Sequence, residues 1–101
     1  MPVRLMQRDP RWLIRLEGLI GVACAGELKD LLVEWRTAGK DLELDLESVQ
    51  EIDITILQLL HAATREGERS GAQIVGRASA DVMFLVRQSG FDQIPGFLFR
   101  E

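Results

Sequence analysis

Two observations predict an α/β fold with a central sheet. Segments whose apolar residues recur at every second position alternate along the chain with segments whose apolar residues follow a helical period. The chain has 101 residues, of which 47% are hydrophobic, and this suffices for one core but not for two. We therefore expect residues 1–101 to form a single domain, in which right-handed crossover helices join the strands and pack on the sheet.

Two strands are predicted at the start of the chain. A strand over residues 12–16 follows from apolar side chains at every second position. A short edge strand over residues 3–6 precedes it, and the pair Asp9-Pro10 marks a turn between the two. Antiparallel pairing of these strands would make the sheet mixed.

An amphipathic helix is predicted over residues 22–38. Gly18 and Gly21 interrupt the strand pattern before it, and Gly39 is a natural stop after it. Its apolar face carries Leu28, Leu31, Leu32 and Trp35.

The next strand is predicted over residues 42–46, where three leucines alternate with acidic residues. Residues 48–51 are expected to form a loop. A second helix is expected from Ile54 to about Glu68, with Asp53 as its N-cap.

The last elements are a short strand over residues 73–75 and a third helix that Ser79 caps and Gly90 ends. An apolar tail over residues 91–99 is expected to fold back over an edge of the core. Phe84 lies outside the apolar arc of the third helix, so it either extends an interaction surface or is covered by the tail.

The composition argues against several classes of function. A net charge of −4 disfavours binding to nucleic acid, which needs a basic face. No apolar run approaches the ~18 residues of a membrane span, and no secretory signal is apparent. The single cysteine, Cys24, allows no internal disulfide. We therefore expect a cytoplasmic protein that does not insert into a membrane.

Catalytic, cofactor and metal chemistry find no support in the residue pattern. One histidine, one cysteine and no tyrosine make no catalytic constellation, and no glycine-rich phosphate loop is present, so we expect neither an enzyme nor a cofactor. Acids at positions 41, 43, 45 and 47 lie on one side of a predicted strand but lack the spacing of a calcium loop. We expect that side to be solvated or to form salt bridges with a partner. Asp45, placed near the strand's end, is expected to point toward the following turn.

That turn, before the second helix, is the candidate interaction site. Thr55 lies in the first helical turn, where free backbone N–H groups and the positive end of the helix dipole favour negative charge. A phosphoryl group on Thr55 would be tolerated there and would add charge beside Asp53. Ile54 falls on the polar side of the helix with Gln58, where it gains nothing from burial. From spacing alone, Thr55 could equally be only a helix-start residue.

Three segments resemble the STAS family, in the form found in bacterial anti-sigma-factor antagonists of the SpoIIAA and RsbV type. Residues 16–28, LEGLIGVACAGEL, are similar to the family's strand, glycine and first helix. Residues 42–49, LELDLESV, are similar to its central strand, with the family's aspartate at Asp45. Residues 52–60, IDITILQLL, are similar to its signature turn. The resemblance implies a four- to five-stranded mixed sheet with helices packed mainly on one face.

The resemblance also implies a partner switch, in sigma-factor control or in chemotaxis. A GHKL-type serine/threonine kinase, often the anti-sigma factor itself, phosphorylates such domains, and a phosphatase removes the mark. Thr55 occupies the acceptor position. Ile54 and Ile56 depart from the family's small residue and glycine, and both would hinder the approach of a kinase. The candidate partner-binding residues are Asp45, Asp53, Ile54, Thr55 and Gln58.

Two alternatives stay open. STAS domains of the MlaB type bind the ATPase of a lipid-transport ABC complex and need no phosphorylation. Other STAS domains are proposed to bind nucleotides.

Overall fold

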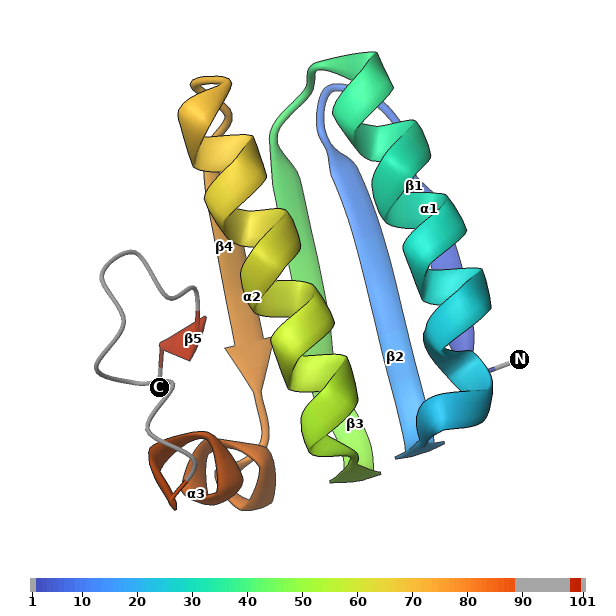
Figure 1. Ribbon diagram of the computed structural model, residues 1–101, viewed down its shortest axis with the longest axis vertical. Coiled ribbons are helices and arrows are strands. Elements are labelled where there is room, and N and C mark those ends of the chain that lie inside the picture. Colours follow the sequence, from blue (N-terminus) through green and yellow to red (C-terminus); the bar gives the residue numbers. More distant parts are fainter. Residues whose placement is uncertain (1, 89–98, 101) are drawn as a thin grey trace.

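The computed structural model describes residues 2–88 and 99–100. Within them a single sheet carries two helices across one face, and a third helix lies near one end of the sheet (Figure 1). In chain order the elements are β1 (Val3–Gln7), β2 (Trp12–Ile20), the short 3-10 helix η1 (Val22–Cys24), α1 (Ala25–Ala38), β3 (Leu42–Ile52), α2 (Ile54–Arg69), β4 (Ile74–Ala78), α3 (Ala80–Gln88) and β5 (Phe99–Arg100).

The sheet is mixed, and its strands lie in the order of the chain. β1 pairs with β2 antiparallel, whereas the remaining pairs, from β2 through β5, are parallel. Each crossover therefore steps in the same direction across the sheet. Because crossovers are right-handed, this order places α1 and α2 on the same face, as Figure 1 shows. The predicted α/β fold, a mixed sheet with helices mainly on one face, is confirmed.

The predicted loop over residues 48–51 is wrong, because β3 continues to Ile52. The register of β3 against β2 shifts twice, after Asp45 and after Val49, and each time β3 carries one extra residue. Such β-bulges change which side chains face the core. The buried apolar positions consequently move to every third residue, at Leu46, Val49 and Ile52. The alternation of a regular strand is lost while the strand itself continues.

The start of the first helix also differs from the prediction. The η1 turn comes first, and α1 begins at Ala25 rather than at Val22. Its end agrees with the prediction, since Gly39 adopts a left-handed conformation with φ of 69° and donates its N–H to the Trp35 carbonyl. None of the described helices is both long and apolar enough to cross a membrane.

The indole of Trp35 sets how closely α1 and α2 approach. The ring is buried, and its Nε1–H donates a hydrogen bond of 2.6 Å to the Lys40 carbonyl. Gly67 on α2 faces the ring. A Cβ atom at this position would overlap the indole and come within 2.7 Å of the Ile74 Cδ1 atom. Glycine is therefore required here by packing, whatever its helix propensity.

α3 begins as predicted. The Ser79 hydroxyl oxygen accepts a hydrogen bond of 3.3 Å from the Val82 N–H, which caps the helix. The helix contacts β3 and buries Val82, Met83 and Val86. Phe84 is exposed, with 61% of its surface accessible.

The predicted helix end at Gly90 and most of the apolar tail lie outside the described residues. Of the predicted tail only Phe99 is described, and with Arg100 it forms β5, which pairs with β4 in parallel.

We expect Gly67→Ala to destabilise the fold. The added methyl group must displace the Trp35 ring or open the α1–α2 contact, and overpacking of this kind costs about 1–3 kcal/mol. Gly26→Ala on α1 is the matched control, because a Cβ atom there meets nothing within 4 Å. That variant should be neutral or more stable by up to about 1 kcal/mol. Urea unfolding measures both, and equal midpoints for the two variants would contradict the packing role of Gly67.

Candidate functional site

The turn between β3 and α2 is fixed to the sheet by its own backbone. The Asp53 N–H donates a hydrogen bond of 2.8 Å to the Ile20 carbonyl, which ties the end of β3 to the end of β2. On the other side, the Asp53 carbonyl accepts from the Ile56 and Leu57 N–H groups at 3.0 and 3.3 Å. The backbone of Asp53 thus makes both the last hydrogen bond between β2 and the end of β3 and the first hydrogen bonds of α2.

The side chain of Asp53 caps α2, as the sequence predicts. Its Oδ1 atom accepts a hydrogen bond of 2.7 Å from the Thr55 N–H, and its backbone is extended, with φ of −73° and ψ of 143°. This backbone hydrogen bond, with a further one from the Thr55 side chain, lowers the pKa of Asp53 below its usual value. The carboxylate is therefore charged throughout the neutral range.

The first turn of α2 divides sharply between core and surface. Ile56 and Leu57 are fully buried, so they hold the helix against the sheet. Ile54, Thr55 and Gln58 point outward, and Ile54 keeps 48% of its surface exposed. Residues one helical turn apart share a face, so Gln58 lies beside Ile54. Four of the five candidate residues are thus brought together in one place.

Asp45 does not belong to this group, and its expected position near the turn is corrected. It lies in the middle of β3, because the strand continues for seven more residues to Ile52. Its buried carboxylate accepts from the Arg15 side chain on β2 at 3.1 Å and from the Glu47 N–H at 3.0 Å. Since the neighbouring Leu44 and Leu46 face the core, Asp45 faces the side of the sheet that α1 and α2 leave uncovered.

Two other acids of the same strand, Glu43 and Glu47, form ion pairs within the chain. Glu43 lies between two arginines, at 3.2 Å from Arg11 and 2.6 Å from Arg77, and Arg77 also lies 3.6 Å from Glu47. Arginine side chains therefore occupy the space beside these carboxylates. In the described part of the chain, no group of three or more potential ligands could hold a metal ion.

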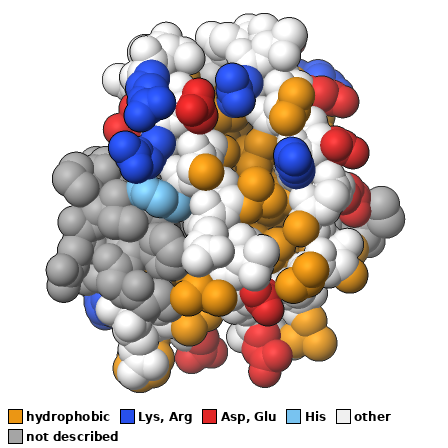
Figure 2. All heavy atoms as spheres, in the orientation of Figure 1, with side chains coloured by type: hydrophobic (Ala, Val, Ile, Leu, Met, Phe, Trp, Pro, Cys, Tyr) orange, Lys and Arg blue, Asp and Glu red, His pale blue; other side chains and the backbone are white. Residues whose placement is uncertain are grey.

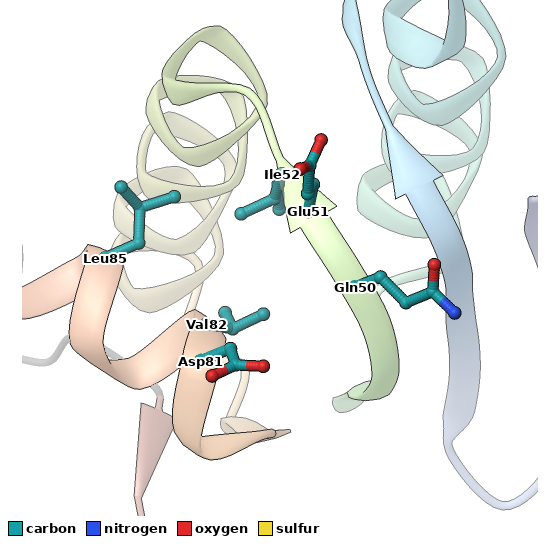
Figure 3. A pocket seen from close by; sticks show the side chains of 6 residues that line it. All are labelled: Gln50, Glu51, Ile52, Asp81, Val82 and Leu85. Atoms are coloured by element: carbon teal, nitrogen blue, oxygen red, sulfur yellow. The ribbon is translucent and has the colours of Figure 1, made fainter.

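Two hollows flank the turn, and sequence reasoning missed both. One, of about 290 Å³, lies between the ends of β2 and β3 and is lined by Leu19, Glu51 and Asp53 among others. The second, of about 260 Å³, lies between the end of β3 and α3, and Figure 3 shows Ile52 directed toward Leu85 across it. No local pattern marks these residues, because the bulges of β3 decide which strand residues meet here.

Comparison with known proteins decides the family. The model of the MlaB-type STAS domain matches residues 3–99. The chain belongs to the STAS domain family. A search of curated protein sequences found no significant match to this STAS domain.

Solved structures share the fold of this STAS domain. The unphosphorylated anti-sigma factor antagonist SpoIIAA superimposes with a TM-score of 0.70 at 15% identity, over 94% of this chain and 99% of that one. A Thermotoga maritima protein provisionally described as an anti-sigma factor antagonist has a TM-score of 0.70 at 15% identity, over 99% of this chain and 86% of that one.

A third similar structure belongs to a longer protein. A chain named Mglu superimposes with a TM-score of 0.64 at 24% identity, and the match covers 74% of this chain. It covers only 19% of the Mglu chain, so the present chain matches a small part of that protein.

The cap at Asp53 should make stability depend on pH. Because its pKa is lowered in the folded chain, its charged form stabilises the fold above the ordinary pKa of 3.8, and that contribution is lost as the pH falls through the folded pKa. Asp53→Ala should therefore lower the urea midpoint at pH 7. The difference in urea midpoint between this variant and wild type should become smaller between about pH 5 and pH 2.

Asp53→Asn separates the cap from the charge, because asparagine is a good neutral N-cap. At pH 7 the urea midpoint of Asp53→Asn should therefore lie closer to that of wild type than the urea midpoint of Asp53→Ala does. If the difference in urea midpoint between wild type and Asp53→Ala stays constant down to the lowest pH, the charge of Asp53 does not contribute to the cap.

Proposed function

We propose that this STAS domain is a non-enzymatic regulatory domain that binds a protein partner at the start of α2, and that phosphorylation of Thr55 controls the binding. The observation that carries the proposal is the position of Thr55. It is exposed, it lies two residues after Asp53, whose carboxylate accepts a hydrogen bond from its N–H, and it follows the exposed apolar side chain of Ile54.

Phosphorylation at this position would change the surface without unfolding the helix. A phosphoryl group brings a charge of about −1.5 to −2 at neutral pH, and the positive end of the α2 dipole favours it. The buried Ile56 and Leu57 would keep the helix in place. The added charge would lie beside the charged Asp53 and in the middle of the surface formed by Ile54 and Gln58, where it would repel a partner suited to the unmodified state.

The partners proposed for this switch are a GHKL-type serine/threonine kinase, in many cases an anti-sigma factor, and an opposing phosphatase, in the cytoplasm. The similarity in fold to SpoIIAA and to the Thermotoga protein supports a role as an anti-sigma-factor antagonist or a chemotaxis-associated relative. Asp45 faces another side of the sheet, so a partner contact there would require a partner that also reaches the uncovered face.

A second candidate is a subunit of an ABC transport complex that binds its ATPase without phosphorylation. The match to the MlaB-type family model favours it. So does the exposed side chain of Ile54, which stands where the antagonist type has a small residue. The bulk of Ile54 beside the Thr55 hydroxyl would restrict a kinase and would serve a permanent apolar contact equally well.

Variants of Thr55 separate the two functions. With the partner isolated from native lysate by wild-type protein, Thr55→Glu should weaken binding at least about tenfold in the phosphorylation switch, whereas Thr55→Val, which keeps the shape without the hydroxyl, should bind like wild type. Thr37→Glu is the control, since Thr37 is exposed near the far end of α1. Titration calorimetry gives the affinities, and mass spectrometry of wild-type protein from cells reports phosphorylation.

Equal binding by Thr55→Glu and wild type, with no phosphate on Thr55, would contradict the switch. Such a result, together with copurification of an ATPase, would favour the transporter subunit. If Thr37→Glu and Thr55→Glu weaken partner binding equally, the partner does not dock at the start of α2.

A further inference from the structure

The hollow beside α3 is lined by both apolar and acidic side chains. Ile52, Val82 and Leu85 are its apolar residues, and Ile52 points from β3 toward α3 in Figure 3. Asp81, in the first turn of α3, and Glu51, at the end of β3, also line it. Its volume of about 260 Å³ is open to solvent and could accept one long side chain.

None of the acidic groups at this end is paired with a cation among the described residues. Glu51 and Asp81 form no side-chain hydrogen bond or ion pair in residues 2–88 or 99–100. Asp53, which lines the neighbouring hollow, is charged at neutral pH and is held only by the N-terminal groups of α2. Among the described residues that line either hollow there is no Lys, Arg or His.

Exposed apolar side chains surround the same end. Leu19 at the end of β2, Val22 in η1 and Ile54 at the start of α2 keep 64%, 61% and 48% of their surfaces exposed. In Figure 2 the lower edge of the molecule shows acidic and hydrophobic side chains together, whereas the upper half shows Lys and Arg side chains interspersed with acidic ones. The cations of the upper half form ion pairs with those acids, as Arg8 does with Glu34 and Arg36 with Glu66. The end that carries the turn therefore combines negative charge with apolar surface, while the opposite end carries charges of both signs.

We infer that the segment bound at this end is a basic, apolar segment of a protein, with an arginine or lysine that enters the hollow between β3 and α3. The aliphatic stem of that residue would lie on Ile52, Val82 and Leu85, and its charged head would meet the carboxylate of Asp81. Glu51 points away from Asp81 in Figure 3 and lines both hollows, so its charge would attract the segment from the other side of β3. Flanking apolar residues of the segment would cover Leu19, Val22 and Ile54. This inference rests on the proposed docking at the start of α2 and adds the chemistry of the partner.

The same charges weigh against a nucleotide at this end. Phosphate groups would meet three carboxylates and no described cation in the lining of the two hollows. A basic segment gains from those charges in two ways, since they raise its rate of association and stabilise the bound state.

A pair of synthetic peptides tests the charge requirement directly. The probes are Ac-LARLLRAL-NH2 and its acidic counterpart Ac-LAELLEAL-NH2, titrated into the isotope-labelled full chain and followed by NMR. The arginine peptide should shift the backbone amides of Glu51, Ile52 and Val82, and the shifts should diminish as salt is added. Equal responses to the two peptides, shifts confined to the α1–α2 face, or no shifts with the arginine peptide would overturn the inference.

Charge variants link the peptide result to named residues. The double variant Glu51→Gln with Asp81→Asn should bind the arginine peptide at least about tenfold more weakly than wild type. Glu68→Gln is the matched control, because Glu68 is exposed near the far end of α2. If the double variant and the control lose affinity for the arginine peptide equally, the inference is overturned.

The native partner then separates this inference from the switch. If Thr55→Glu releases that partner while the double variant binds it like wild type, the basic segment is refuted and the switch stands. If the double variant fails to bind while Thr55→Glu binds normally, the switch is refuted and the basic segment stands.

Discussion

The hydrogen bond from the Asp53 N–H to the Ile20 carbonyl is the constraint on which the site depends. It closes the end of the β2–β3 pair at the residue where α2 begins, so the direction of the helix is set by the sheet. Burial of Ile56 and Leu57 fixes the rotation of the helix about its axis. With direction and rotation both fixed, Ile54, Thr55 and Gln58 can only face outward, although Ile54 is a β-branched apolar residue.

The surroundings of the turn divide the molecule into regions with different physical roles. The α1–α2 layer packs around Trp35 and leaves no room for a side chain at position 67. On the uncovered face, arginines bridge the acids of β3, so its charges satisfy one another. At the carboxyl end of the sheet the carboxylates of Glu51 and Asp81 lack described partners, Asp53 bonds only to Thr55, and apolar side chains are exposed. That contrast distinguishes the end with the turn from the rest of the described surface.

Periodicity in the sequence predicts most of the elements and the start of the site. Strands and helices follow from apolar spacing, and the cap follows from an aspartate just before a helical pattern, so Asp53 and its exposed neighbours can be placed from sequence. The bulges of β3 cannot, because an extra residue in a strand looks like the end of its alternation. Two differences from the predicted structure share this cause: β3 continues to Ile52, beyond its predicted end, and Asp45 lies in mid-strand, away from the turn. The hollows were missed because their linings come from strands and a helix distant in sequence.

Site-specific photocrosslinking tests the central claim, that the partner docks at the start of α2, most directly. A benzophenone side chain is placed at Ile54 in one variant and at Val33, an exposed apolar position on α1, in another. The account predicts that the partner held by the full chain crosslinks strongly from position 54 and weakly or not at all from position 33. Strong crosslinking from position 33 with none from position 54 would contradict it and would place the partner on the helical face.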